Sequence, residues 1–382
     1  MLQQKREKRT SLSGQSILVI GTDSWFGPLL SKHHLVLELC KRNNVLYLEP
    51  FYHAGKLLRG RLPHDLYHER YHDEQPSALM RLQPWRLPKS ESLPLMRSLS
   101  ERLLLARLRI RNFHPRIIIS FSPHFIFLKE KLGVPFIYYC VDHQTDGAAE
   151  AATLARADLV IAATQVLYDR FRGRTRRLEY LPHGVGPIAL NQGSLTPPAD
   201  IAAVPHPIAG YVGAVNSTLD INLCERLIRA QPRLSLVLVG PYEKDSFAGK
   251  GLPGEWLNRL RSLPNTYLLG PRPSRELGAY INSFDVCLIP YDILHPRVHF
   301  SYHKVLQYLA MGKPVVTTCA ADSSILPPHV AVAETPEAFI AAVNRALADH
   351  DEAARRRCRA FAGEQTWDKR VEQLAEWVEQ VI

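Results

Sequence analysis

Short apolar runs alternate with amphipathic helical patterns along most of the chain. In the first half, runs such as SILVIGT (16–22), NVLYLEPF (44–51) and RIIISFS (116–122) are rich in β-branched residues, and segments with helical periodicity separate them. Strands that are apolar throughout and alternate with helices predict a mostly parallel sheet with both faces covered. We therefore expect a Rossmann-like unit over residues 15–190, preceded by a basic tail over residues 1–14.

The same alternation restarts in the second half. Segment 191–206 is rich in proline and lacks a periodic pattern, which is typical of a linker. After it, runs such as LSLVLVGP (234–241) alternate with helical patterns and predict a second Rossmann-like unit over residues 207–362. Residues 363–382 predict an amphipathic C-terminal helix that packs back on the first unit. The expected fold class is α/β, with ligands bound in a cleft beyond the strand ends of two Rossmann-like domains.

Charge is distributed unevenly between the two halves. Residues 1–190 contain 28 Lys and Arg against 17 Asp and Glu, whereas residues 191–382 contain 19 against 20. The basic half suits an anionic partner such as a membrane surface, a nucleic acid or a diphosphate, and a solvated basic surface explains it equally well. The sequence has no apolar run long enough to span a bilayer and no signal-peptide pattern, which predicts a cytoplasmic protein. Its six scattered cysteines lack zinc-ligand spacing and are expected to be reduced core residues.

The stretch HFSYHKVLQYLAMGKPVV (299–316) predicts a ligand site at the start of a helix. A helix is expected from about residue 302 to 311, with Ser301 as its N-cap and Lys304 in its first turn. A cation is unfavourable at a helix N-terminus unless an anion is bound there, so Lys304 indicates a diphosphate site, with Gln307 one turn later. Further residues expected to line this pocket are Tyr291 and His303. The alternative is an ordinary amphipathic helix with a solvated Lys304.

The run SYHKVLQYLAMGKPVV (301–316) resembles the signature segment of GT-B glycosyltransferases, of the glycosyl transferase group 1/family 4-like type. LPHGV (181–185), LVLVGP (236–241) and TYLLGPRPSRELGAYINSFDVCLIPY (266–291) are similar to further landmarks in the same order. The resemblance covers nearly the whole chain. It implies an enzyme that moves a sugar from a nucleotide-diphosphate donor, expected to be a UDP-sugar.

The resemblance also implies further donor contacts and a stereochemical course. Gly213, with Asn216 nearby, matches the glycine loop that approaches the diphosphate, and Arg272 matches the region that contacts the nucleotide base. Retaining members carry two glutamates where this chain has His299 and Gln307. The chain is therefore similar to inverting members, nearest in motif to the xanthan-type glucuronosyltransferases.

Inversion requires a group that removes the proton from the attacking hydroxyl. Asp142 follows the strand pattern FIYYC (136–140), and inverting members place an aspartate after the corresponding strand, so Asp142 is the expected base. His143 and Asp146 are alternatives, although Asp146 is better placed to cap the following helix. No metal and no cofactor beyond the nucleotide sugar are expected, because Lys304 and its helix can neutralise the leaving diphosphate.

The acceptor is expected to meet the first half of the chain. The residues expected to contact it are Asp23, Ser24, Trp25 and His33. Trp25 has the alternative roles of core residue and membrane contact. Segment 94–113 combines leucines with arginines, which is typical of a helix on an anionic membrane, or of an ordinary helix with a solvated arginine face. The membrane interpretation predicts peripheral attachment to the inner face of the membrane and a lipid-linked saccharide acceptor in polysaccharide synthesis.

Three other functions remain compatible with this scaffold. They are a nucleic-acid-binding or DNA-modifying protein, a soluble glycosyltransferase with a small-molecule acceptor, and a scaffold that binds the donor without transfer. Nucleic acid is disfavoured as a partner because the arginine-rich segment lacks interleaved aromatic residues for base stacking.

Overall fold

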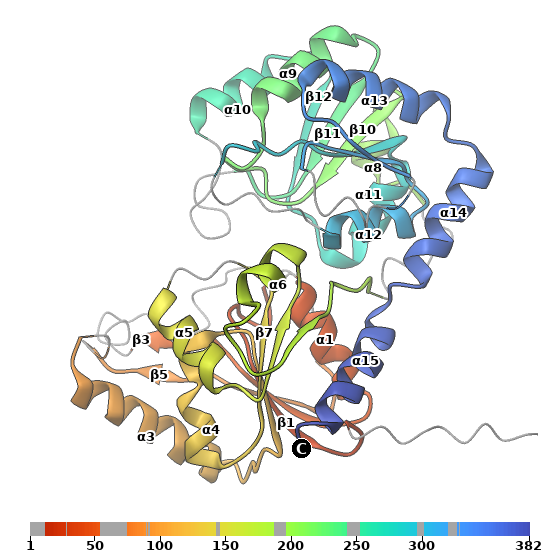
Figure 1. Ribbon diagram of the computed structural model, residues 1–382. Helices are drawn as coiled ribbons and strands as arrows, with labels where there is room; N and C mark the ends of the chain where they lie inside the picture. The colour runs from red at the N-terminus through yellow and green to blue at the C-terminus, as the bar shows by residue number, and fades with distance from the viewer. Residues whose placement is uncertain are drawn as a thin grey trace, which may run out of the picture. The chain divides into compact units, whose positions relative to one another are not determined.

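A computed structural model describes residues 12–27, 29–53, 75–88, 90, 92–142, 146–186, 196–242, 253–295, 302–319, 327 and 329–382. The chain divides into two compact units (Figure 1). Unit 1 contains the chain up to His183 together with Trp367–Ile382, and unit 2 contains Gly184–Thr366.

Unit 1 is built on a parallel sheet. Its strands are β1 (Ser16–Ile20), β2 (Asn44–Leu48), β3 (Tyr52–His53), β4 (Leu79–Leu82), β5 (Trp85–Arg86), β6 (Ile117–Ser120), β7 (Phe136–Cys140), β8 (Leu159–Ala162) and β9 (Leu178–Tyr180). Its helices are α1 (Ser31–Cys40), α3 (Pro94–Ile110), α4 (Phe127–Leu132), α5 (Gly147–Arg156), α6 (Gln165–Phe171) and α15 (Trp367–Glu379), with a 3₁₀ turn at Pro123–Phe125. The main sheet has the order β4-β2-β1-β6-β7-β8-β9, and β3 pairs separately with β5.

Successive residues of the unit 1 strands enter two different cores. In β1, Ile17 and Val19 pack with α1 and α15, whereas Leu18 and Ile20 pack on the opposite face with α3 and α4. Because helices cover both faces, each strand is apolar at consecutive positions. The predicted Rossmann-like fold of the first half is confirmed.

The C-terminal helix belongs to unit 1. Trp367 is 1% exposed, and Leu374 and Val378 of α15 are also buried in the core that α1 shares. Figure 1 shows α15 beside α1. The prediction that this helix packs back on the first unit is confirmed.

Unit 2 is also a parallel α/β unit. Its strands are β10 (Ile208–Val212), β11 (Ser235–Val239), β12 (Thr266–Gly270), β13 (Val286–Ile289), β14 (Val315–Thr317) and β15 (Val330–Val332). Its helices are α8 (Ala199–Ala202), α9 (Ile221–Ala230), α10 (Gly254–Arg261), α11 (Leu277–Ser283), α12 (Tyr302–Ala310), α13 (Pro336–Ala348) and α14 (Glu352–Gly363), with a 3₁₀ turn at Ser274–Glu276. The sheet order is β12-β11-β10-β13-β14-β15. β10 therefore lies between β11 and β13, in the interior of the sheet.

The predicted linker over residues 191–206 differs from the structure at its second end. Residues 187–195 lie outside the described residues, but Ile201 and Val204 are buried in the core of unit 2. Proline richness indicated a flexible connection, whereas burial of these two apolar side chains fixes the segment to the unit. Tertiary packing, rather than proline content, therefore determines the structure of this part of the segment.

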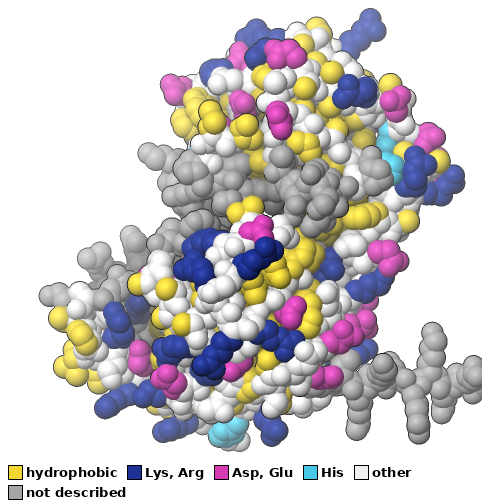
Figure 2. All heavy atoms as spheres, viewed as in Figure 1, with side chains coloured by type: hydrophobic (Ala, Val, Ile, Leu, Met, Phe, Trp, Pro, Cys, Tyr) yellow, Lys and Arg dark blue, Asp and Glu magenta, His cyan; other side chains and the backbone are white. Residues whose placement is uncertain are grey.

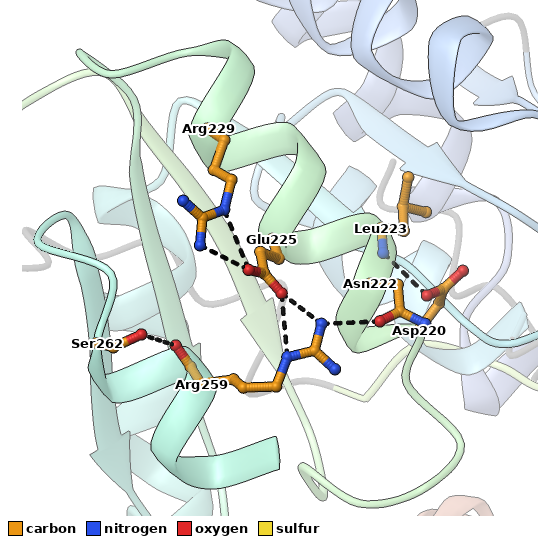
Figure 3. Close-up of polar contacts among 7 residues, drawn as sticks. All are labelled: Asp220, Asn222, Leu223, Glu225, Arg229, Arg259 and Ser262. Atoms are coloured by element: carbon orange, nitrogen blue, oxygen red, sulfur yellow. Dashed lines mark hydrogen bonds and ion pairs between the residues drawn. The ribbon is translucent and has the colours of Figure 1, made fainter. Parts of the chain in front are cut away.

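A charged network joins two surface helices of unit 2. The Glu225 carboxylate accepts hydrogen bonds from Arg229, one turn along α9, and from Arg259 of α10, whose guanidinium also donates to Asn222 (Figure 3). Hydrogen bonds from Arg229 and Arg259 hold the pKa of Glu225 below its usual value. Asp220 caps α9 by accepting from the Leu223 amide at 2.9 Å. These contacts lie on an exposed face and mainly set how α9 and α10 pack.

All six cysteines are free and buried, as predicted. Within the described ranges, no helix combines the length and apolar character needed to cross a bilayer.

Candidate functional site

Three glycines follow or end adjacent strands of unit 2 and stack at the same sheet edge. Gly213, Gly240 and Gly270 follow β10 and β11 and end β12, and all three have positive φ. The Gly213 amide donates to the Val239 carbonyl at 2.9 Å, and the Gly240 amide donates to the Gly270 carbonyl at 2.9 Å. A Cβ at Gly240 would lie 1.9 Å from the Gly213 carbonyl oxygen. Only glycine allows these turns to approach so closely.

Helix α12 brings a cation against the first of these turns. A Cβ at Gly213 would lie 2.7 Å from Lys304 Cε and 2.9 Å from Lys304 Nζ. Lys304 Nζ also lies 5.8 Å from the centroid of the Tyr211 ring, within the range of a cation–π contact. Among the described residues, no acidic side chain forms an ion pair with Lys304. The geometry therefore leaves this ammonium beside backbone and an aromatic ring, in the first turn of a helix, which favours an anionic ligand.

Two tyrosine hydroxyls form hydrogen bonds with backbone groups at the turn after β10. The Val212 amide donates to the Tyr308 hydroxyl at 2.9 Å, and the Tyr211 hydroxyl donates to the Ala214 carbonyl at 3.2 Å. The rings of Tyr211 and Tyr291 meet edge to face with centroids 6.5 Å apart. Tyr291 thus packs against the same Tyr211 ring that Lys304 contacts, and its contact with a donor stays a prediction. Tyr211 and Tyr308 were missed, although Tyr308 lies inside the recognised QYLA run.

Two predicted donor residues use their side chains within unit 2. Asn216 Oδ1 accepts from the Thr218 amide at 3.0 Å and from its hydroxyl at 2.7 Å, which fixes the loop after β10. Arg272 donates to the Tyr280 hydroxyl at 2.8 Å and to Asp200 at 2.6 Å. Arg272 therefore serves the packing of α8, and its donor contact stays a prediction.

The remaining donor predictions concern α12 itself. The helix begins at Tyr302 and ends at Ala310, close to the predicted bounds, while Ser301 lies outside the described residues. His303 and Gln307 are half-buried on this helix on either side of Lys304. Their contacts with a ligand stay predictions.

In unit 1, Asp142 lies beyond the C-terminal end of β7 and its side chain is exposed. The Cys140 thiol donates to the Asp142 carbonyl at 3.2 Å, which fixes the backbone at this point. His143 lies outside the described residues. Asp146 caps α5 by accepting from the Ala149 amide at 3.0 Å, so its predicted capping role is confirmed.

His183 is a functional candidate that sequence analysis missed. It follows β9, and its ring centroid lies 6.5 Å from that of Trp367. Burial lowers the pKa of His183 to about 4; the Asp142 carboxylate raises this pKa, whereas Arg370 and Lys32 lower it. Its imidazole is consequently neutral at physiological pH. His183 lies in the LPHGV motif, so the sequence offered it as a candidate. Only the fold brings its ring close enough to interact electrostatically with Asp142.

The loop after β1 contains three of the predicted acceptor residues, Asp23, Ser24 and Trp25, whereas His33 lies in α1. Asp23 forms an ion pair with Lys32, and the Asp23 side chain is 35% exposed whereas that of Lys32 is 5% exposed. Burial acts to raise the pKa of Asp23, but Lys32 and a hydrogen bond from Thr22 outweigh it, so this pKa lies below its usual value. Ser24 is half-buried. Asp23 and Ser24 stay candidates for contact with a ligand.

Trp25 and His33 were wrong as acceptor contacts. Both side chains are fully buried, and their rings meet edge to face with centroids 5.3 Å apart. The Leu30 amide donates to His33 Nδ1 at 3.0 Å, so Nε2 carries the proton toward the Ser24 carbonyl at 3.2 Å. These residues build the core beneath the loop, which was the alternative open for Trp25.

No cluster of three or more His, Cys, Asp and Glu side chains with metal-binding geometry occurs among the described residues.

Comparisons with known proteins place this arrangement in context. Residues 221–376 match the family model described as glycosyl transferase-like. TuaH of Bacillus subtilis, named as a teichuronic acid biosynthesis glycosyltransferase, is 26% identical over 166 residues. That match covers 42% of this chain and spans 40% of the length of TuaH.

Solved structures share the architecture of nearly the whole chain. Anabaena HepE, in complex with UDP and glucose, superposes with a TM-score of 0.66 at 17% identity, covering 96% of this chain and 99% of HepE. Sucrose-phosphate synthase from Thermosynechococcus elongatus gives a TM-score of 0.67 at 17% identity, with coverage of 96% and 99%. At this identity the likeness shows the fold.

The stacked glycine turns predict an order of stability among alanine variants. Gly213→Ala should lower the free energy of unfolding by about 1–3 kcal/mol, because of its positive φ and because the end of Lys304 can move aside. Gly240→Ala should lower it by about 3 kcal/mol or more, since its Cβ meets backbone that cannot move. Calorimetry of the full chain measures both. Gly254→Ala, which meets nothing within 4 Å at the start of α10, is the control and should be neutral or stabilising. Equal losses at Gly213 and Gly240 would contradict the stacking.

Proposed function

We propose that this chain, a GT-B glycosyltransferase, moves a sugar from a UDP-sugar to a lipid-linked saccharide acceptor on a membrane, in polysaccharide or glycoconjugate synthesis. The proposal of a nucleotide-sugar donor rests on one observation. The Lys304 ammonium, in the first turn of α12, lies beside the backbone of Gly213. A diphosphate fits there because its charge complements both the cation and the helix N-terminus. HepE, which shares the fold, was solved with UDP and with UDP-glucose, and this supports a UDP-sugar as donor.

The reaction we propose is a direct displacement with inversion. The acceptor hydroxyl attacks the anomeric carbon, its proton passes to the Asp142 carboxylate, and the bond to the UDP oxygen breaks. Lys304 and the first amides of α12 stabilise the negative charge that develops on the departing diphosphate. A metal ion is not required in this proposal because the cation of Lys304 takes the place that a divalent ion would have.

The support for Asp142 as the base comes from its surroundings in unit 1. Its carboxylate is exposed at the end of β7 and acts electrostatically on the neutral His183. Asp146 is engaged at the N-terminus of α5 and is therefore a poorer candidate. An exposed carboxylate at a strand end can accept a proton and release it to water after transfer.

The support for membrane attachment comes from α3. Only Ser100, Leu104 and Leu108 of its described residues are buried, while Leu95 and Ile110 are 67% and 83% exposed. Figure 2 shows yellow hydrophobic side chains near α3, with dark-blue Lys and Arg side chains around them. Exposed aliphatic residues within an arginine-rich helix suit an anionic bilayer, where each basic residue near the surface contributes about 1 kcal/mol. We therefore propose a peripheral enzyme on the inner face of the cytoplasmic membrane.

UDP binding tests the donor site. Lys304→Ala should weaken binding of UDP by about 10- to 100-fold, because one charge-assisted contact to phosphate is lost. Titration calorimetry or thermal shift with UDP measures this. Arg229→Ala, which removes an exposed guanidinium on α9, should bind UDP as the wild type does. If UDP fails to bind the wild type, or binds Lys304→Ala equally well, the donor site is elsewhere.

Transfer assays test the base. Asp142→Asn should reduce transfer from a radiolabelled UDP-sugar to a membrane lipid extract by about 100-fold or more, with UDP affinity unchanged. Asp146→Asn is the matched control, because asparagine caps a helix as well as aspartate does, and it should retain turnover. EDTA should leave wild-type turnover unchanged. Near-normal transfer by Asp142→Asn would remove Asp142 as the base.

Vesicle binding tests α3. The double variant Leu95→Ser/Ile110→Ser should partition about 10-fold or more less strongly to phosphatidylglycerol vesicles, since two aliphatic side chains no longer enter the bilayer. Val166→Ser, which alters a residue of α6 that is 73% exposed, is the control and should bind normally. Salt-sensitive binding to duplex DNA, without vesicle binding, would instead favour the nucleic-acid function.

A further inference from the structure

The loop after β1 is held by buried polar groups. The Tyr47 hydroxyl donates to the Asp23 carbonyl at 2.8 Å, and His33 Nε2 donates to the Ser24 carbonyl at 3.2 Å. The Trp25 amide donates to the Glu49 carboxylate at 3.1 Å. Three consecutive residues therefore have a backbone group bound by a side chain from α1, from β2 or from the position just after β2. Such a loop keeps its shape without a ligand.

Glycine makes room for this arrangement. A Cβ at Gly21 would lie 1.9 Å from the Tyr47 hydroxyl oxygen, so a larger residue would displace the group that holds Asp23. Glu49 is 4% exposed, and Arg81 donates to its second oxygen at 3.4 Å. Burial raises the pKa of Glu49, against hydrogen bonds from the Trp25 amide, Arg81 and Ser24. The buried carboxyl group of Glu49 thus holds this loop through its hydrogen bond from the Trp25 amide.

The Asp23 side chain points a carboxylate out of the fixed loop. Lys32 and the Thr22 hydroxyl both bind the same oxygen, Oδ2, the hydroxyl at 2.9 Å. Lys32 is a buried lysine of α1, whereas one third of the Asp23 side chain remains accessible. Burying a lysine is costly, and the ion pair with Asp23 offsets part of that cost while leaving the carboxylate partly accessible. Both printed hydrogen bonds use Oδ2, and the Asp23 side chain remains 35% exposed, so the carboxylate retains capacity to accept a further hydrogen bond.

Asp23 and Asp142 lie at the same edge of the same sheet. They follow β1 and β7, which are separated by β6 alone. Strands in a sheet lie about 4.8 Å apart, so the ends of β1 and β7 from which the two loops begin lie about 10 Å apart. That spacing fits a saccharide that offers one hydroxyl to each carboxylate.

We propose that Asp23 is a specificity-determining residue that accepts a hydrogen bond from a second hydroxyl of the acceptor sugar, and that Lys32 is a positioning residue that fixes its orientation and its charge. This inference rests on the proposed glycosyltransferase function. Asp23 is then distinct from the base, because a carboxylate paired with a buried ammonium accepts hydrogen bonds but takes a proton poorly. In this proposal the carboxylate of Asp23 selects an acceptor sugar by one hydroxyl that does not react.

Binding of octyl glycosides tests the role of Asp23. A panel of octyl glucoside, galactoside, mannoside and glucuronide is titrated by saturation-transfer NMR into the wild type and into Asp23→Asn. We expect at least one glycoside to bind the wild type about 10-fold more tightly than the variant, since a charged acceptor is replaced by a neutral one. If no glycoside binds in a manner that depends on Asp23, the proposal is overturned.

Dependence on pH separates positioning by Lys32 from a merely structural role. The titratable groups that act on Asp23 are Lys32 and His33 of α1, while Tyr47 of β2 binds its carbonyl. In Lys32→Met, burial then raises the pKa of Asp23 without an opposing cation. Between about pH 8 and about pH 5, glycoside affinity should fall about 5-fold in Lys32→Met and less than about 2-fold in the wild type.

Conservative and matched variants complete this test. Lys32→Arg should restore affinity at the lower pH, because it returns a cation to Asp23. Lys41→Met removes an exposed lysine of the same region, paired with Glu38, and should behave as the wild type. A pH response in Lys32→Met equal to that of the wild type would overturn the positioning role.

Measuring UDP binding distinguishes a failure of the proposal for Asp23 from a failure of the proposed glycosyltransferase function. Asp23→Asn and Lys32→Met should bind UDP with wild-type affinity, because both lie in unit 1. Loss of glycoside recognition with intact UDP binding supports the inference. Absence of UDP binding in the wild type would instead count against the proposed function itself.

Discussion

The approach of Lys304 to the turn after β10 depends on the absence of a side chain at residue 213. Any Cβ there would occupy the space of the lysine side chain, and the Gly213 carbonyl in turn packs against Gly240. The first turn of α12 can therefore lie over the strand ends only because successive turns are reduced to backbone. The Lys304 ammonium lies over the ring of Tyr211, and the buried rings of Tyr211 and Tyr291 pack against each other beside this turn.

Unit 1 reaches a comparable rigidity by a different physical route. Its loop after β1 has ordinary side chains, and buried hydrogen-bonding groups from Tyr47, His33 and Glu49 hold the backbone in place. Buried polar groups of this kind cost free energy unless every one of them is paired. Unit 2 thus uses glycine where neighbouring turns approach each other closely, and unit 1 uses side-chain anchors to fix the loop that contains Asp23.

The sequence was informative where one local pattern determines the outcome. Consecutive apolar residues in 16–20 and 208–212 predicted buried parallel strands, and the lysine beside a helix start predicted the position of Lys304 correctly. Local pattern could not decide which way a side chain points. Trp25 and His33 lie in or near the loop after β1 beside Asp23, yet they turn into the core while Asp23 turns outward.

The local sequence pattern could not predict contacts between segments that are far apart in the chain either. The partner of Arg272 is Asp200, in a proline-rich stretch that predicted a linker, and the electrostatic neighbours of His183 come from β7, α1 and α15. In each case the sequence contained the chemical groups, whereas the pairing depended on packing of elements far apart in the chain.

The net positive charge of the chain and the cation of the candidate donor site lie in different halves of the sequence. The second half of the chain is nearly neutral, with 19 basic and 20 acidic residues, yet it contains the cation expected to bind the diphosphate. That cation is one ammonium in the first turn of a helix, close to the Tyr211 ring and without an acidic partner among the described residues. The basic excess of the first half is instead spread over exposed helices such as α3, where screening by salt makes it suitable for reversible contact with an extended anionic surface. In the proposed function, the charge assigned to donor binding and the charges assigned to surface attachment therefore belong to different units.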